Sequence, residues 1–373
     1  MYSTTLVPPK PIIGFLGLGL IGGSIAKGIR RYYPSATIIG YNHNFSTTQL
    51  AMDDGTIHIA AKEVDHTFST CDIIYLCMPV SYNVEYLKKI KPFLKPSCIL
   101  TDVGSVKGNI HKAVNELGLS SNFIGGHPMA GSEKTGYINA TDHLVENAYY
   151  AITPCSETEE HSLLLLKELT ASLGAIPVIL SPEEHDYAVA AISHLPHMIA
   201  SGLVNLIQSI DSKDQIMKTI AAGGFKDITR IASASPIMWQ QICLTNKENI
   251  VKTMEQYLTY FTEIKNAVEK GDSNYLYQFF NGGKEYRNSI PSAPSGPMAK
   301  VYGIYCDIID EAGSLAKAAS LLAASNISIK NIGITHTREF QEDVLRIEFY
   351  TQKAADLATQ VLNSHQYHVT QLC

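Results

Sequence analysis

A glycine-rich turn near the amino end constrains the fold of this chain more than any other stretch. An apolar run from Ile12 to Leu16 is followed by this turn and then by an amphipathic stretch that reaches Tyr33. Strand, glycine turn and helix in this order are typical of a dinucleotide-binding unit, in which the glycines permit a tight turn and close approach of a pyrophosphate. We therefore predict an α/β fold with an N-terminal Rossmann-type domain. The predicted cofactor-binding residues of the turn are Gly17, Leu18, Gly19, Leu20, Ile21 and Gly22.

The residue at the ribose position departs from the usual pattern. A second predicted strand, Thr37 to Tyr41, ends where an Asp or Glu commonly binds the ribose, but Asn42 stands there. An asparagine can still bind a ribose hydroxyl, yet it lacks the charge that repels a 2′-phosphate. Because no Arg or Lys follows closely to hold that phosphate, we expect NAD, and NADP stays open.

Two further predicted strands end in turns that we expect at the cofactor. Asp72 to Cys77 runs into Met78-Pro79, and Cys98 to Val103 runs into Gly104-Ser105. In an open parallel sheet, ligands gather beyond the carboxyl ends of the strands. We therefore add Met78, Pro79 and Ser105 to the cofactor site, and we expect Ser105 to cap the helix that reaches Leu117.

The next short strand leads into a histidine between glycines and a proline. In Gly125-Gly126-His127-Pro128, the proline favours an extended conformation at His127, so we expect a stiff, exposed turn. Histidine titrates near neutrality and is often used for proton transfer, although many histidines only occupy polar loops. His127 is therefore a candidate general base.

The chain is long enough for more than one domain. A length of 373 residues corresponds to two or three domains of about 150 residues. Short strand-like runs and a helix continue to Ser181, after which the pattern becomes helical, with Ser181 as N-cap and Pro182 in the first turn. The predicted domains are residues 1–181 for the dinucleotide, 182–290 for substrate and dimerisation, and 298–373 for a regulatory module.

The helical part carries several candidate binding residues. His194 and His197 share a helix face, and Pro196 between them should bend the helix. The two histidines lack a third ligand nearby, so we favour a polar pocket over a metal site. Lys226, Asp227 and Arg230 follow two glycines in an apolar region, where an arginine suits a carboxylate. A further helical pattern from Pro236 to Glu269 carries the single tryptophan, Trp239.

The last part of the chain has its own strand and helix order. Residues 291–297 are rich in proline, serine and glycine and read as a linker. The following segments predict strand 299–306, helix 314–325, strands 327–334 and 344–350, helix 354–362 and strand 367–371. This βαββαβ order is that of a small ferredoxin-like module.

Composition excludes several other classes of protein. The net charge is −6 with no run of Lys and Arg, which disfavours nucleic acid. The seven cysteines are odd in number and form no C-x-x-C pair, as expected for reduced thiols in a cytoplasmic protein. The amino end lacks the pattern of a secretory signal, and the uncharged run from Pro11 to Ala26 is too short to span a bilayer. We therefore expect no membrane segment.

Five motifs stand in order along the chain. They are Gly17 to Ser24, Asp102-Val103-Gly104-Ser105-Val106-Lys107, Gly126-His127-Pro128-Met129-Ala130-Gly131-Ser132-Glu133, Ser193-His194-Leu195-Pro196-His197 and Gly223 to Arg230. Together they resemble the prephenate dehydrogenase family of tyrosine biosynthesis, and the C-terminal module resembles an ACT domain, an amino-acid-sensing unit. The resemblance implies that prephenate and NAD give 4-hydroxyphenylpyruvate, carbon dioxide and NADH.

The resemblance also implies residue roles. His127 would accept the proton of the substrate hydroxyl, Ser105 would orient the imidazole, and Arg230 would hold a substrate carboxylate. The other residues expected to shape the substrate pocket are Lys226, His194, His197, Ser193, Ser132, Glu133 and Trp239. Asp186 and Asp227 are expected to fix neighbouring histidine or arginine side chains rather than to act directly.

Partners follow from the same resemblance. We expect a homodimer through the helical domain, whose stretch 181–287 has more apolar surface than one chain could easily cover. We also expect tyrosine as a feedback inhibitor of the ACT-like module, where Gly313 permits close backbone approach; a module that only forms dimers is the alternative. The predicted effector-binding residues are Asp310, Ala312, Gly313, Asn331 and Ile332.

Two other functions stay open at this point. Arogenate dehydrogenase performs the same ring chemistry on a substrate with an amino acid side chain in place of the keto acid. A catalytically silent regulator that binds a dinucleotide and an amino acid is the second alternative, although the presence of both His127 and Arg230 argues against it.

Overall fold

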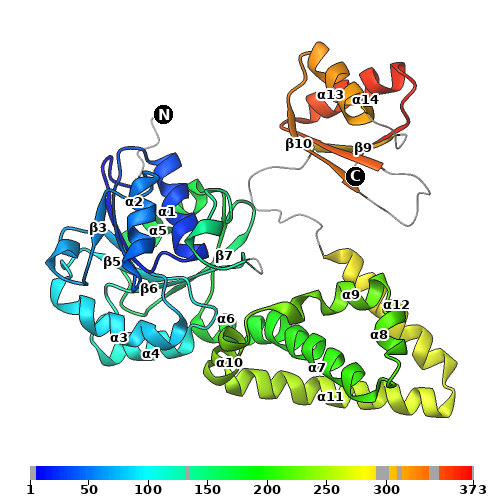
Figure 1. Ribbon diagram of the computed structural model, residues 1–373, viewed down its shortest axis with the longest axis horizontal. Coiled ribbons are helices and arrows are strands. Elements are labelled where there is room, and N and C mark those ends of the chain that lie inside the picture. Colours follow the sequence, from blue (N-terminus) through cyan, green and yellow to red (C-terminus); the bar gives the residue numbers. More distant parts are fainter. Residues whose placement is uncertain (1–5, 132–133, 291–301, 309–312, 336–343, 372–373) are drawn as a thin grey trace. The chain divides into compact units, whose positions relative to one another are not determined.

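The chain folds into two compact units, Met1–Asn288 and Ser289–Cys373 (Figure 1). The computed structural model describes residues 6–131, 134–290, 302–308, 313–335 and 344–371. The domain boundary predicted at residue 181 lies inside the first unit, where strands give way to helices. The boundary predicted in the proline-rich linker lies close to the division between the two units.

A five-stranded parallel sheet forms the amino-terminal part and confirms the predicted Rossmann-type fold. Its strand order is β3-β2-β1-β4-β5, so the order reverses beside β1, where such sheets bind their ligand. The strands are almost continuously apolar because helices cover both faces. The elements are β1 (Ile12–Leu16), α1 (Leu20–Tyr32), β2 (Thr37–Tyr41), α2 (Phe45–Asp53), β3 (Ile59–Ala61), β4 (Ile73–Leu76), α3 (Val80–Ile90), β5 (Ile99–Asp102) and α4 (Gly108–Glu116).

A second sheet continues from the first and corrects the prediction for His127. β6 (Ile124–Pro128) is antiparallel to β7 (Tyr149–Pro154), and β7 is parallel to β8 (Ile176–Ile179), with α5 (Glu160–Ser172) between them. A parallel bridge from Leu100 to Phe123 places β6 beside β5. His127 therefore lies inside a strand, opposite Ala151, and the predicted exposed turn is wrong. The strand persists because its partner β7 supplies hydrogen bonds on both sides of Pro128.

The rest of the first unit is helical. Ser181 caps α6 in a capping box with Glu184, which confirms the predicted helix start. A π-helical turn precedes Pro196, where the missing backbone N–H interrupts the regular ladder. The predicted continuous helix from Pro236 is wrong, since the chain breaks at Asn246 with φ −112° and ψ 32°. The elements are α6 (Pro182–Val189), the π turn (Ala190–His194), α7 (Leu195–Ile210), α8 (Ile216–Ile220), α9 (Gly223–Thr229), a 3₁₀ turn (Arg230–Ser233), α10 (Pro236–Thr245), α11 (Lys247–Lys270) and α12 (Ser273–Ser289).

One helical stretch of the described chain, Pro182–Ile210, is long and apolar enough to cross a membrane by length and composition alone. It carries the buried ionisable side chains of His185, Asp186 and His194. Such groups are rare in helices that face lipid. This single stretch is therefore weak support for a membrane span.

The second unit has the βαββαβ order predicted for it. Its antiparallel sheet has the order β10-β11-β9-β12, and two helices cover one face (Figure 1). Ile304, Leu322 and Leu345 are fully buried between sheet and helices. The elements are β9 (Tyr302–Asp307), α13 (Ser314–Ala324), β10 (Ile329–Thr335), β11 (Val344–Phe349), α14 (Gln352–Ser364) and β12 (Val369–Gln371).

Candidate active site

The glycine turn between β1 and α1 has the shape of a pyrophosphate cradle. Gly17 has a φ of +105°, and a Cβ there would lie 2.8 Å from the backbone of Cys77. A Cβ on Gly22 would collide with the Gly17 carbonyl oxygen, whereas no atom lies within 4 Å of a Cβ built on Gly19. Gly19 thus leaves open space before the amino end of α1, whose first turn holds no acidic side chain. A pyrophosphate fits there because the free N–H groups of a helix start attract anions.

Asn42 joins the end of β2 to the glycine turn. Its Oδ1 accepts a hydrogen bond from Leu18 N at 3.1 Å, and its Nδ2 donates to the carbonyl oxygen two residues later at 3.3 Å. The ribose end of the site therefore holds a neutral amide. Met78 and Pro79 follow β4 beside the same turn, since a Cβ on Gly17 would lie 3.1 Å from Met78 N. The predicted cofactor residues are thus gathered at one edge of the sheet.

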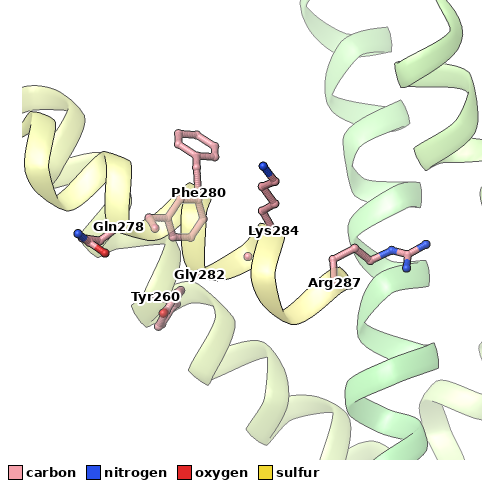
Figure 2. A pocket seen from close by; sticks show the side chains of 8 residues that line it. Tyr260, Gln278, Phe280, Gly282, Lys284 and Arg287 are labelled. Carbon is pink, nitrogen blue, oxygen red and sulfur yellow. The ribbon is translucent and has the colours of Figure 1, made fainter. Parts of the chain in front are cut away.

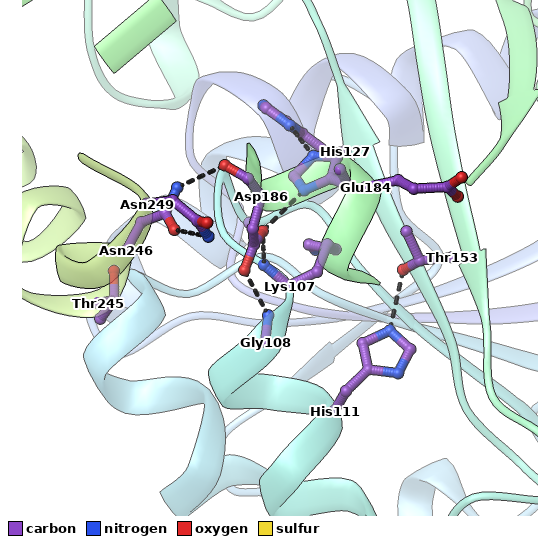
Figure 3. A network of polar contacts seen from close by, with 12 residues as sticks. Lys107, Gly108, His111, His127, Thr153, Glu184, Asp186, Thr245, Asn246 and Asn249 are labelled. Atoms are coloured by element: carbon purple, nitrogen blue, oxygen red, sulfur yellow. Dashed lines mark hydrogen bonds and ion pairs between the residues drawn. The ribbon is translucent and has the colours of Figure 1, made fainter. Parts of the chain in front are cut away.

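His127 begins a chain of three side chains that crosses from the sheet to the helical part. Its Nδ1 lies 2.8 Å from His185 Nε2, and His185 Nδ1 lies 2.8 Å from Asp186 Oδ1 (Figure 3). His185 and Asp186 are buried on α6, while His127 is half-buried on β6. The imidazole of His127 is therefore held from the side of Nδ1.

The carboxylate at the end of this chain is fixed by several donors. Asp186 Oδ1 also accepts from Lys107 N at 2.7 Å, and Oδ2 accepts from Gly108 N at 2.8 Å. Burial works to raise the pKa of Asp186, but the hydrogen bonds from His185 and from these two backbone groups outweigh it and lower the pKa. Asp186 thus stays ionised and accepts only.

An ionised Asp186 determines where the protons of the two imidazoles lie. His185 Nδ1 must carry a proton to donate to the carboxylate, which leaves Nε2 of a neutral His185 as an acceptor. His127 Nδ1 then donates to that nitrogen, and His127 Nε2 keeps its lone pair. Burial, together with His185, Lys107 and His194 nearby, holds the pKa of His127 well below its ordinary value. The neutral imidazole has one nitrogen able to accept a proton.

Ser105 does not have the capping role predicted from the sequence. The helix after it begins at Gly108, and the side chain of Asp186, from α6, accepts hydrogen bonds from the first N–H groups of α4. Lys107 is the N-cap residue of α4, but its own side chain makes no capping hydrogen bond. Asp186, which is distant in the sequence, provides the cap instead. The proposed contact of Ser105 with His127 stays a prediction.

The predicted histidines of the helical part surround the tryptophan. His197 stacks on Trp239 with ring centroids 3.5 Å apart, and His194 meets the same ring edge-on at 5.9 Å. Both histidines are buried, and burial lowers the pKa of His194 to about 4. Asn246 ties this group to Asp186, since its Nδ2 donates to Asp186 O at 2.8 Å and lies 3.3 Å from His194 Nδ1.

The remaining predicted residues are less closely linked to His127. Lys226, Asp227 and Arg230 are exposed on α9 and the turn after it, which pack against α7, and Ser193 is half-buried in the π turn. Gly313, with φ +98°, precedes α13, while the exposed Asn331 and Ile332 lie on β10. Four predicted residues lie outside the described part of the chain; they are Ser132, Glu133, Asp310 and Ala312. Within the described ranges, no group of three His, Cys, Asp or Glu side chains is arranged to hold a metal ion.

Sequence reasoning missed two residues of the site. His185 lies in the run Glu183-Glu184-His185-Asp186, which reads as the polar start of a helix, and His127 is 58 residues away. Asn246 lies at the break between α10 and α11, which the sequence pattern did not reveal. The available signal for His185 was a histidine followed directly by an aspartate, at the start of the long helical pattern after Ser181.

A parallel sheet of this order, a glycine cradle at its switch point and a neutral histidine at the same edge define a nicotinamide-nucleotide-dependent dehydrogenase. Residues 25–188 match the family model described as prephenate dehydrogenase, nucleotide-binding domain, and residues 181–282 match prephenate dehydrogenase, dimerization domain. The chain is 35% identical over 363 residues to prephenate dehydrogenase of Bacillus subtilis, covering 97% of this chain and 98% of that protein.

Solved structures agree with these matches. Prephenate dehydrogenase of A. aeolicus, in complex with hydroxyphenyl propionate and NAD+, has a TM-score of 0.71 and 33% identity, over 75% of this chain and 98% of that one. Synechocystis arogenate dehydrogenase has a TM-score of 0.68 and 30% identity, over 75% of this chain and 100% of that one. The chain belongs to the prephenate dehydrogenase family and is an NAD-dependent oxidoreductase.

Proposed function

We propose that this chain oxidises and decarboxylates prephenate with NAD, and that His127 is the general base. The observation that carries the proposal is the hydrogen-bonded series His127, His185 and Asp186, which holds a neutral imidazole with one nitrogen free to accept a proton. A positioned acceptor of this kind accelerates proton transfer by roughly 10² to 10⁴.

For this reaction the protein mainly has to hold the substrate and NAD in position and to provide one proton acceptor. As hydride leaves the ring carbon that bears the hydroxyl, the hydroxyl proton passes to His127 Nε2 and the oxygen becomes a carbonyl. Loss of the ring carboxylate as carbon dioxide makes the ring aromatic and leaves a phenolate, which regains the proton. NAD, held at the glycine turn, supplies the hydride acceptor. The positive charge on His127 is stabilised through His185 by Asp186.

The helical part would supply the substrate pocket. Stacking of His197 on Trp239 and the edge-on contact of His194 build an aromatic wall linked to Asp186 through Asn246. The indole Nε1 of Trp239 is buried without a hydrogen-bond partner in the described residues, so it suits an acceptor on a ligand. Ser193, Lys226 and Arg230 would bind the substrate carboxylates, with Asp227 holding a neighbouring cation and Ser132 and Glu133 completing the pocket.

Arogenate is the competing substrate, because the similarity to Synechocystis arogenate dehydrogenase is almost as strong as that to the A. aeolicus enzyme. NADH formation, followed by absorbance, should be measured with prephenate and with arogenate, each with NAD and with NADP. We expect prephenate with NAD to give the highest kcat/KM. A higher kcat/KM with arogenate would make this an arogenate dehydrogenase, and no turnover with either substrate would contradict the proposal.

We further propose a homodimer formed through the helical part. Large apolar side chains of α11 and α12 are exposed, including those of Tyr260 and Phe280, which line a pocket with Lys284 and Arg287 (Figure 2). An exposed surface of this kind marks a protein interface more often than a free surface. The match of residues 181–282 to a dimerisation domain supports the same reading. Sedimentation velocity should show a dimer at micromolar concentration.

The ACT-like module is proposed to bind tyrosine as a feedback inhibitor. Gly313 has a positive φ before α13, and there is open space where a Cβ would be, so a ligand can approach its backbone. Asn331 and Ile332 of β10 are also proposed for the effector site, as are Asp310 and Ala312, which lie outside the described residues. A chain that ends at Pro291 should keep its turnover and lose inhibition by tyrosine. Inhibition that survives the truncation would place tyrosine at the active site.

A further inference from the structure

A fully buried ion pair lies beneath His127 and has no part in the proton transfer described above. Lys107 and Asp102 side chains are both 0% exposed, and Lys107 Nζ lies 2.5 Å from Asp102 Oδ2. Burial lowers the pKa of Lys107, while Asp102 works to raise it. Buried pairs often contribute little net stability, because desolvation of the two charges offsets their attraction. The position of this pair therefore calls for a role besides stability.

The pair holds the peptide groups on both sides of Gly126, the residue before His127. Lys107 Nζ donates to Gly126 O at 2.7 Å, and Gly126 N donates to Asp102 Oδ1 at 3.1 Å. A Cβ on Gly126 would lie 2.6 Å from Asp102 O and 2.9 Å from the Tyr150 hydroxyl, so the backbone is enclosed from this side too. The main chain that carries the imidazole is thus fixed by charged groups.

Lys107 also holds Asp186, the carboxylate at the other end of the hydrogen-bonded series His127, His185 and Asp186. Lys107 N donates to Asp186 Oδ1, the oxygen that accepts from His185 Nδ1 (Figure 3). The side chain of Lys107 therefore fixes His127, and its backbone fixes the carboxylate that holds His185. Lys107 thus connects β6 of the nucleotide-binding part with α6 of the helical part.

We propose that Asp102 and Lys107 are positioning residues. They fix the position of His127 relative to His185 and so direct His127 Nε2 toward the substrate hydroxyl. This inference rests on the proposed function, in which His127 is the base. Neither residue touches the reacting atoms. The Lys107 charge also lies close enough to His127 to favour its neutral form.

The test uses the full-length chain and three variants. Lys107→Met removes the cation, and Asp102→Asn with Lys107→Met removes both charges while keeping similar volumes, so that it folds even where the single variant does not. Lys95→Met is the matched control, because Lys95 forms a 2.5 Å pair with Asp72 at the start of β4, away from His127. For each variant, kcat, KM for prephenate, affinity for NAD and the pH profile of kcat/KM are measured.

We expect kcat to fall roughly 10- to 100-fold in both Lys107 variants, since small misplacements of reacting groups have effects of this size. Affinity for NAD should stay within about threefold, and the acidic limb of the profile should move to higher pH as the cation near His127 is lost. Lys95→Met should change none of these. A normal kcat and an unmoved acidic limb in a folded Lys107 variant would overturn the inference. Full activity of His127→Asn would instead refute the proposed role of His127 as base, on which the inference rests. An inactive His127→Asn together with normal Lys107 variants would overturn the inference alone, so the two failures are distinguishable.

Discussion

The nucleotide-binding part, residues 6–181, and the helical part, residues 182–290, bury their side chains in different ways. In the first, apolar residues fill the space between sheet and helices, as where the rings of Phe15 and Tyr75 stack at 5.0 Å. In the second, large apolar side chains are often exposed, among them Ile220 at 71% and Phe280 at 68%. The buried apolar residues of the helical part are Val189, Ala190, Ala200, Ile242, Ile250 and Ala267.

In the helical part, several polar side chains are buried although large apolar side chains are exposed. His185, Asp186, His194 and Asn246 are almost fully buried there, and they contact one another. The helical part therefore buries polar side chains of the candidate site in its interior, while large apolar side chains remain exposed on its surface. The nucleotide-binding part thus buries its apolar side chains within one chain. We expect the helical part to bury its exposed apolar side chains only in a dimer.

The largest expected effect comes from removing the proposed base, His127, which lies in the nucleotide-binding part. His127→Asn should lower kcat by roughly 10² to 10⁴, because the proton acceptor is lost, while NAD still binds at the intact glycine turn. Steady-state kinetics and NAD titration check this. His143→Asn, at an exposed histidine paired with Asp142, is the control and should behave as wild type. Turnover that survives in His127→Asn would remove His127 from the mechanism.

The second prediction concerns the contact between the two parts. Asp186→Asn should lower kcat roughly 10- to 100-fold, since an amide cannot accept from His185 and from the backbone N–H groups of both Lys107 and Gly108. Asp211→Asn is a matched control, because Asp211 also accepts backbone N–H groups but is only half-buried. Equal kcat values for the two variants would show that Asp186 only joins helices.

Features that depend on contacts between residues close in the sequence could be predicted, and those that depend on residues far apart in the sequence could not. The glycine turn, the parallel strands and the βαββαβ module could be predicted because their signals are local, in residues such as Gly17 and Gly313. The strand at His127 could not, since it exists only through pairing with β7. The same is true of Asp186 as the cap of α4, which lies 79 residues from Lys107.

The third prediction tests whether the exposed apolar surface of the helical part is an interface. Phe280→Glu should weaken dimer association by roughly 30-fold or more, the usual size of about 2 kcal/mol at an important interface residue. Ile138→Glu is the control, because Ile138 is 87% exposed but belongs to the nucleotide-binding part. Sedimentation equilibrium of both variants checks this, and equal dissociation constants would mean that the exposed apolar surface around Phe280 is not the dimer interface.

The smallest expected effect is a pH dependence of stability to which one histidine in each part contributes, half-buried His111 and buried His194. Burial lowers the pKa of His111, beside Thr153, and of His194 to about 4 in the folded chain. The unfolded chain binds these protons near pH 6.5, so the free energy of unfolding is full above that pH and decreases as pH falls toward 4.

Each histidine contributes at most about 1.4 kcal/mol per pH unit in that window. Urea unfolding at pH 7 and pH 5, at one protein concentration, measures the loss. His111→Gln and His194→Gln should each reduce it, and an equal reduction would show that burial of a histidine has the same consequence in both parts. A loss that neither substitution changes would assign the pH dependence to other groups.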